Sequence, residues 1–595
     1  MASSMNSLEA IQKKIDAVKL FLSVSLSIAN AHTVDFYTCN VWDQFMAVPP
    51  VEVLTEITLN GDHKRAPEHY LNHGNAKKIT FGFCDDSKRL VDVAEFLEAA
   101  YAHSLPGLGV CVGRTELLQS LRHTDNAQPL EEVPGAVVES DEFMNSKKSH
   151  EVQAMSEVVA SLAQRCRVKQ VKDTTGSHFS RHKTEENTLK QIEVIDVGSG
   201  KGYLCSFLSL RYGLQVYGID SSSVNTHGAQ ERNRKLKKYS RAYQRHSKAN
   251  RTPTVVPPSG QEDLEDIAPE DNSLPELDQS DPASAPEEPF LSALCVGMVE
   301  PTSPRVPPSE LSLEERERRK RENLERKARS WVNSGGMGSG MLYSPLTSYV
   351  TAETELKEII GELEDAVMVG LHTCGDLAPS TLRMFVAKRE LLSVCSVGCC
   401  YHLLSEEFDP TRQECPSSSV CGFPLSGYLR EQSWFCGRNA RMSACLALER
   451  VSKGQGIQME SLFYRAVLHV ILRDHYSSFK SEKRVGNVYS KATSFVDYVW
   501  RALRRLELDG SKLSDGVIQG YHDTYRPRMV EMEAFNMLKV TLAPCIEGLI
   551  LLDRLCYLKE QEDVAFSTLV QLFDPLLSPR CYGVVGVKAP GTELS

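Results

Sequence analysis

A short apolar run followed at once by alternating glycines constrains the fold of this chain more than any other feature. Residues 192–197 (IEVIDV) are mainly apolar and β-branched, which is typical of a strand buried on both faces of a parallel sheet. The glycine turn 198–202 follows, then apolar residues at helical spacing over 203–212, and then a second buried run, 215–219. Strand, turn, helix and strand in this order predict a βαβ unit of an α/β fold.

The same alternation returns after a long interruption. Strands are predicted over 366–371 and 391–397, and apolar residues at helical spacing predict a helix over 377–388 between them. Two further strands, 568–573 and 581–587, are close enough in sequence to form a hairpin near the end of the chain.

The interruption itself has an unusual composition. Residues 232–251 contain nine Lys or Arg and no acid, and residues 261–288 contain eleven Asp or Glu and no base. Residues 252–308 hold 12 of the 28 prolines, so this stretch buries too little apolar surface to order and is predicted to be disordered. Residues 312–331 are predicted to form a charged, solvated helix. The basic run is interpreted as a solvated helix extension or a partner of the acidic run, with nucleic-acid binding as the alternative.

Charge and cysteine content restrict the class of protein. The formal net charge of −11 over 595 residues argues against a protein surface covered with basic charge that binds nucleic acid. A local basic patch is still compatible with this net charge. The 17 cysteines are odd in number and include no CxxC pair, which favours a reducing, intracellular compartment, the cytoplasm or nucleus or both. No run of 18 uncharged apolar residues is present, so no membrane association is expected. Apolar residues from Leu8 onward fit one face of an amphipathic helix better than a secretory signal.

The glycine turn has the chemistry of a cofactor site. Gly198, Gly200 and Gly202 alternate, and Asp196 precedes the first of them by two residues. A dinucleotide site uses the spacing GxGxxG and rests a pyrophosphate on the helix N-terminus, where a carboxylate such as Asp196 would repel it. The same carboxylate suits a cation, and S-adenosylmethionine carries an ammonium and a sulfonium group and no phosphate.

A second acid supports this interpretation. Asp220 directly follows the second strand, where a carboxylate can accept both hydroxyls of a ribose. The alternatives are a tight turn with no ligand, and a nicotinamide or flavin site, which the glycine spacing disfavours. The predicted cofactor is therefore S-adenosylmethionine, and the predicted cofactor-binding residues are Asp196, Gly198, Ser199, Gly200, Gly202 and Asp220.

Two polar clusters follow the strands 366–371 and 391–397, and strand ends of a doubly wound sheet face the ligand cleft. As a substrate cleft, His372, Tyr401 and His402 would position a nucleophile and accept its proton. Lining residues would be Cys374, Asp376, Cys399 and Cys400.

Two other interpretations of these clusters remain open. The second interpretation is a zinc site, since Cys and His are residue types that bind zinc. The candidate ligands are Cys374, Cys399, Cys400 and His402. Adjacent cysteines rarely both bind one zinc ion, so no stable metal is expected. The third interpretation is structural: the thiols are buried in the core, and the ring nitrogens of the histidine are hydrogen-bonded within the protein. Further along, Arg438 or Arg441 either closes the cleft on an acidic substrate or belongs to a solvated helix start.

With DVGSGKG, GLHTCGDL and VGCCYHLL in this order, the sequence resembles the methyltransferase-like protein 25 family. The resemblance covers about 140 to 590 and includes the segments MNSKKSHEV (144–152) and GRNARM (437–442). It implies a Rossmann-like class I methyltransferase sheet of seven strands, the last one antiparallel, with helical N- and C-terminal additions and a disordered insertion. The two clusters are also similar to those of a eukaryotic tRNA 2′-O-methyltransferase family, whose second cluster reads CCHH and whose N-terminal zinc-binding cysteines are missing here.

These observations combine into one predicted organisation and two main hypotheses of function. The predicted regions are a helical N-terminal region (1–140), the first half of a methyltransferase domain (141–231), a disordered insertion with a charged helix (232–340), the second half (341–424), a helical insertion (425–565) and closing strands (566–595). The first hypothesis is an S-adenosylmethionine-dependent methyltransferase that acts on RNA or protein by in-line transfer. The alternative is a catalytically silent methyltransferase-fold scaffold or interaction protein.

Overall fold

The computed structural model describes most of the chain outside the predicted insertion. The described residues are 7–60, 81–123, 144–176, 192–249, 343–410, 420–451, 458–476 and 485–589. The acidic run 261–288 and the charged helix predicted over 312–331 lie outside these residues.

The strands in the described residues form one eight-stranded sheet in the order β1-β7-β8-β6-β5-β2-β3-β4. They are β1 (Cys111–Gly113), β2 (Glu193–Val197), β3 (Gln215–Asp220), β4 (Ser344–Thr347), β5 (Ala366–Thr373), β6 (Leu391–Gly398), β7 (Val564–Gln571) and β8 (Tyr582–Lys588). β2 lies between β3 and β5 and is parallel to both, while β8 is antiparallel to β6 and β7. The expected α/β sheet with an antiparallel last strand is confirmed.

The sheet has one strand more than the seven that were expected. β1 comes from the N-terminal region predicted to be helical, and it pairs in parallel with the edge of β7. β4, at the opposite edge, was not predicted either, and it contains Pro345. Edge strands of three or four residues carry too little periodicity to be recognised in a sequence.

Helices cover both faces of the sheet. They are α2 (Leu8–Asn30), α3 (Val41–Phe45), α4 (Pro50–Asn60), α5 (Val93–Ala102), α6 (Leu105–Leu108), α7 (Arg114–His123), α8 (Ser146–Gly176), α9 (Tyr203–Tyr212), α10 (Ser223–Ala249), α13 (Leu356–Ile359), α14 (Leu377–Ala387), α15 (Gly427–Glu431), α16 (Arg438–Ser443), α17 (Leu448–Val451), α18 (Met459–His475), α19 (Phe495–Leu506), α20 (Asp515–Tyr525) and α21 (Met529–Lys559). Neighbouring strand residues face opposite layers: Val194 packs with α8 and α9, whereas Ile195 packs in the core that contains α14 and α21. Both faces of β2 are therefore buried, as the continuous apolar run predicts.

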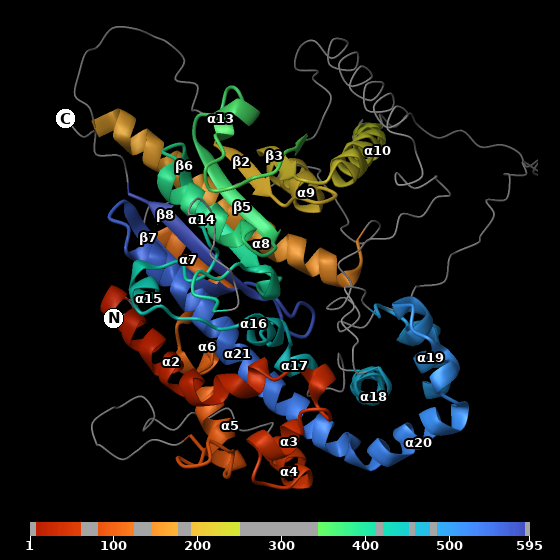
Figure 1. Cartoon of the computed structure of the whole chain (residues 1–595). Coiled ribbons are helices and arrows are strands. Elements are labelled where there is room, and N and C mark those ends of the chain that lie inside the picture. Colours follow the sequence, from red (N-terminus) through yellow and green to blue (C-terminus); the bar gives the residue numbers. More distant parts are fainter. Residues whose placement is uncertain are drawn as a thin grey trace, which may run out of the picture.

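Helix α21 is the axis of the helical additions. Figure 1 shows it running from the sheet toward the helices α3 and α4, with α2 beside it. The stretch Asp515–Lys559 is long and apolar enough to cross a membrane, but 83% of its apolar window is buried inside the described fold, which is the pattern of a core helix. Ile11, Ile15 and Val18 of α2 are fully buried in the same core, as the amphipathic pattern predicts.

Helix α10 continues to Ala249, so most of the basic run 232–251 is helical. This agrees with the interpretation of that run as a helix extension, although the disordered insertion was predicted to begin at residue 232. The short helix α13 ends at Ile359, before the residues that lead to β5.

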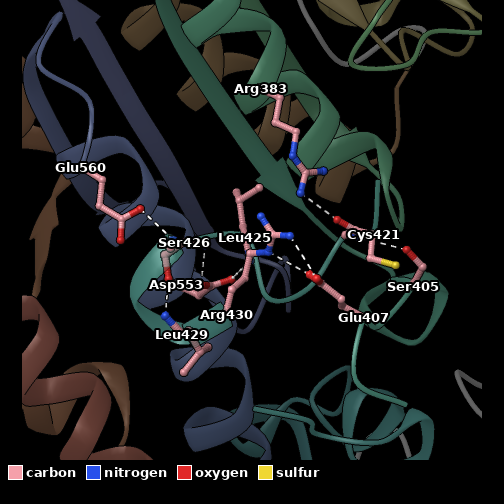
Figure 2. A network of polar contacts seen from close by, with 12 residues as sticks. Arg383, Ser405, Glu407, Cys421, Leu425, Ser426, Leu429, Arg430, Asp553 and Glu560 are labelled. Atoms are coloured by element: carbon pink, nitrogen blue, oxygen red, sulfur yellow. Dashed lines mark hydrogen bonds and ion pairs between the residues drawn. The ribbon is translucent and has the colours of Figure 1, made fainter. Parts of the chain in front are cut away.

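Two carboxylates hold the segment that follows the second polar cluster: Asp553, which is buried in α21, and Glu560, which directly follows that helix (Figure 2). Asp553 accepts hydrogen bonds from the backbone N–H of Leu425 (2.7 Å) and from both the N–H (2.9 Å) and the hydroxyl (2.6 Å) of Ser426. Glu560 accepts from the N–H of Gly427 at 2.9 Å, at the first turn of α15. These contacts satisfy donors that would otherwise lack partners at a helix start.

The other part of the network in Figure 2 joins the same segment to helix α14 and stabilises the segment internally. Arg383 of α14 donates to the carbonyl oxygen of Cys421 at 2.7 Å. Arg430 makes two hydrogen bonds to Glu407, at 2.8 and 3.0 Å. The chain after the second cluster is therefore tied to both α14 and α21.

We expect Asp553→Ala to lower the free energy of unfolding by about 3 kcal/mol, because buried N–H groups lose their acceptor. Chemical denaturation of the full chain measures the change. Glu562→Ala, an exposed acid on the adjoining turn, is the matched control and is expected to change stability by less than about 0.5 kcal/mol. Equal effects of the two substitutions would contradict the assignment.

Candidate functional site

The glycine turn joins β2 to α9 in a conformation that favours glycine. Gly198, Gly200 and Gly202 have φ angles of 74°, 56° and 69°. A Cβ at Gly202 would overlap the Tyr343 hydroxyl, whereas a Cβ at Gly200 would meet nothing within 4 Å. The turn is therefore in close contact with Tyr343 at Gly202, whereas the space beside Gly200 is open. This space leaves room for a ligand at the backbone of Gly200.

Asp220, at the end of β3, holds this turn in place. Its Oδ2 accepts from the N–H of Gly200 at 2.9 Å, and its Oδ1 accepts from the N–H of Ser222 (2.8 Å) and the side-chain amide of Asn225 (3.1 Å). The sequence analysis missed these hydrogen bonds to the turn, because it predicted only that Asp220 binds the hydroxyls of a ribose. A carboxylate has about four acceptor positions, so about one stays available on Oδ2.

Asp196 lies in β2 beneath the turn and is buried. Its Oδ2 accepts from the Cys205 thiol at 3.1 Å, while its Oδ1 is buried with no partner among the described residues. Burial raises the pKa of Asp196 to about 7, although the Cys205 hydrogen bond and the charge of Lys148 both lower that pKa in part. A buried acceptor without a donor suits a cationic or hydrogen-bonding ligand beside the turn.

A cluster of three ionisable side chains lies beside the turn. Lys148 Nζ is 2.8 Å from Glu151 Oε2 and 2.9 Å from His372 Nε2, and the same His372 atom is 3.1 Å from Glu151 Oε2. Ser578 donates to Glu151 Oε1 at 2.8 Å. Burial alone would raise the pKa of Glu151, but the hydrogen bond and charge of His372, together with Lys148, hold that pKa well below its usual range.

The position of His372 connects the cluster to the glycine turn. Its carbonyl oxygen would be 3.3 Å from a Cβ at Gly198, so the end of β5 lies against the start of the turn. Lys148 and Glu151 were missed by the sequence analysis. The available signal was the segment MNSKKSHEV, which was noted only as part of the resemblance.

The cysteines of the two predicted clusters meet at the ends of β5 and β6. Thr373 and Gly398 are register partners, so Cys374 and Cys399 directly follow paired positions. Cys374 Sγ is 2.8 Å from Cys399 Sγ, and the sulfurs of these two residues and Cys400 all lie within 4.8 Å of one another. Thiol hydrogen bonds from its two neighbours lower the pKa of Cys400.

The structure does not bring all predicted site residues to this edge. Tyr401 is buried, and its hydroxyl donates to Glu547 Oε1 of α21 at 2.8 Å. Its predicted placement in the cleft is therefore corrected, because β6 ends at Gly398 and the Tyr401 ring turns into the helical core. His402 is half-buried, with Nδ1 3.8 Å from the Cys445 sulfur, and burial lowers its pKa.

Two further polar residues serve the scaffold. Asp376 Oδ1 accepts from the N–H of Ser405 at 2.8 Å and so anchors the loop after the second cluster. Arg441 is buried on Glu406 at 3.0 Å and donates to the Tyr401 carbonyl oxygen at 3.0 Å. The proposed role of Arg441 in binding an acidic substrate is not compatible with this burial.

The comparisons with known proteins agree with this geometry. A family model described as a methyltransferase domain matches residues 147–407, which include the glycine turn and both clusters. A mouse protein named "Probable methyltransferase-like protein 25" is 46% identical over 98% of this chain and 97% of its own length. The human protein of the same name is 45% identical over 98% of each chain.

The chain belongs to the methyltransferase-like protein 25 family. The match to the family extends over nearly the full chain, so it includes the helical additions as well as the methyltransferase domain. No solved structure matches the chain.

We expect Glu151→Gln to lower the free energy of unfolding by about 3 kcal/mol at neutral pH, because it leaves Lys148 without its buried partner. The folded pKa of Glu151 lies below the ordinary value of 4.5, so its charged form stabilises the fold above that pH. This stabilisation is lost as the pH falls through the folded pKa, and the difference between wild type and variant should shrink on acidification.

Denaturation at a series of pH values measures this difference. Glu157→Gln on the same helix is the control, since Glu157 is 43% exposed and its stability effect should be small at every pH. A difference between wild type and Glu151→Gln that grows toward acidic pH would contradict the assigned charge state.

Proposed function

We propose that this methyltransferase-family protein uses S-adenosylmethionine bound at the glycine turn and transfers the methyl group to a macromolecular acceptor, an RNA or a protein. The observation that carries the proposal is the turn itself, which Asp220 holds open above Gly200. The buried Asp196 Oδ1, which has no hydrogen-bond partner among the described residues, supports a ligand with donors rather than a phosphate.

The residues present fit this cofactor in charge and in shape. Asp220 keeps acceptor capacity for a ribose hydroxyl at the end of β3, and the backbone of Gly200 is accessible. Lys148 offers a positive charge for a carboxylate, and its charge also reaches Asp196. When bound, S-adenosylmethionine would supply an electrophilic methyl group.

The acceptor would lie at the carboxyl ends of β5 and β6, beside the turn. His372 Nε2 is held between Lys148 and Glu151, where it can accept or donate one proton according to its tautomer. In-line displacement gains much of its rate from positioning, so these side chains would act mainly by orienting the acceptor atom. The similarity of the cysteine clusters to a tRNA methyltransferase family favours RNA, whereas the net charge of −11 favours protein.

The location proposed for this protein is intracellular, in the cytoplasm or nucleus or both. No cysteine in the described ranges forms a disulfide, which supports this proposal.

Calorimetric titration of the full chain with S-adenosylmethionine and S-adenosylhomocysteine tests the cofactor site. We expect micromolar binding, and a loss of about tenfold or more in Asp220→Ala because hydrogen bonds to a charged group and the shape of the turn are lost. Asp196→Asn, which keeps the side-chain shape, should also weaken binding. Ser221→Ala, an exposed neighbour of Asp220, is the control and should bind like wild type. A folded wild type that binds neither ligand would overturn the proposal.

A radiolabelled methyl donor then identifies the acceptor class. The full chain is incubated with the donor and with separate RNA and protein fractions from cells that lack the protein. Label in one fraction assigns the acceptor. Binding of the donor without label in either fraction would favour the catalytically silent scaffold.

A further inference from the structure

Three thiols from two separate loops converge at one edge of the sheet. Cys374 follows β5, and Cys399 and Cys400 follow β6. Their sulfurs lie within 4.8 Å of one another, although 25 residues separate Cys374 from Cys399. No disulfide, hydrophobic cluster or ion pair among the described residues accounts for this convergence.

The backbone after β6 explains how two adjacent cysteines reach the same point. In an extended strand, neighbouring side chains point to opposite faces. Here β6 ends at Gly398, and Cys400 has φ −101° and ψ 72°, which turns the chain out of the strand. As a result, the sulfurs of Cys399 and Cys400 are 3.7 Å apart on one side.

The sulfur–sulfur distances can be compared with those of a shared metal ion. Zinc binds thiolates at about 2.3 Å in a tetrahedron, so two of its sulfur ligands lie about 3.8 Å apart. The Cys399–Cys400 sulfur distance of 3.7 Å agrees with this value. The Cys374–Cys399 distance of 2.8 Å lies between this value and the length of a disulfide bond, so these two sulfurs would separate by about 1 Å when one ion binds. A disulfide, with sulfurs about 2.05 Å apart, would join Cys374 to Cys399 and leave Cys400 without a role in the cluster.

The surroundings suit an ion with three thiolate ligands. Zinc and three thiolates together leave about one negative charge. The buried guanidinium of Arg554 lies against Gly398, directly before Cys399, and offsets that charge. Cys374 is exposed, so the outer side of the cluster is open to solvent, whereas His402 is directed to Cys445 and not to the three sulfurs.

We propose that Cys374, Cys399 and Cys400 bind one zinc ion with an open fourth position at the carboxyl edge of β5 and β6. Water or a nitrogen or sulfur atom of a ligand would complete the tetrahedron there. The site replaces the expectation that no stable metal binds, which rested on the rarity of adjacent cysteine ligands. It does not depend on the cofactor proposed for the glycine turn.

The test measures metal in the full chain, purified under reducing conditions. Elemental analysis is expected to find about one zinc per chain. After chelation, titration with Cd²⁺ should produce the absorption band of cadmium–thiolate bonds. Cys374→Ser, Cys399→Ser and Cys400→Ser should each weaken Zn²⁺ binding about tenfold or more. Cys39→Ser, at an exposed cysteine far from the cluster, is the matched control and should bind like wild type.

Circular dichroism of each variant establishes that it is folded, so that a loss of metal reports the site. Absence of zinc and of a cadmium–thiolate band in folded wild type would overturn the proposal. Metal that is retained in all three serine variants would also overturn it. Peptide mapping that finds Cys374 and Cys399 linked by a disulfide in the freshly purified chain would replace the metal site by a redox pair.

Discussion

The parallel register of β3, β2, β5 and β6 is the constraint on which the rest of this structure depends. These strands are buried on both faces, so their register is set by packing against two helical layers rather than by loops. Parallel strands end at the same edge of the sheet, so the segments at their carboxyl ends lie close together. These are the glycine turn after β2, Asp220 at the end of β3, and the polar clusters at the ends of β5 and β6. The site is a consequence of that common edge.

Carboxylates placed at backbone N–H groups hold the irregular segments around this edge. Asp220 fixes the glycine turn, Asp376 fixes the loop after the second cluster, and Asp553 fixes the start of α15. Each carboxylate accepts hydrogen bonds from backbone N–H groups that have no partner within a helix or strand. These hydrogen bonds fix the conformation of the loops. Glu547 serves the core in the same way through Tyr401 and Arg580.

The methyltransferase domain and the helical additions share one core. α21 packs against the last strands as well as α2, and its buried acids reach into the segment after β6. The additions therefore stabilise the end of β6 and the segment after it, beside the thiols. A family match over nearly the full chain is consistent with this dependence.

The sequence by itself determined the βαβ unit, the sheet that resumes at residue 366 and the position of the glycine turn. Buried strands and left-handed glycines leave patterns within a few residues, and these patterns are readable without a structure. Only the tertiary structure decided that Lys148 reaches His372, 224 residues away, and that the Tyr401 hydroxyl turns inward to Glu547. Such contacts depend on side-chain direction just beyond a strand end and on the docking of distant helices, which local periodicity does not record.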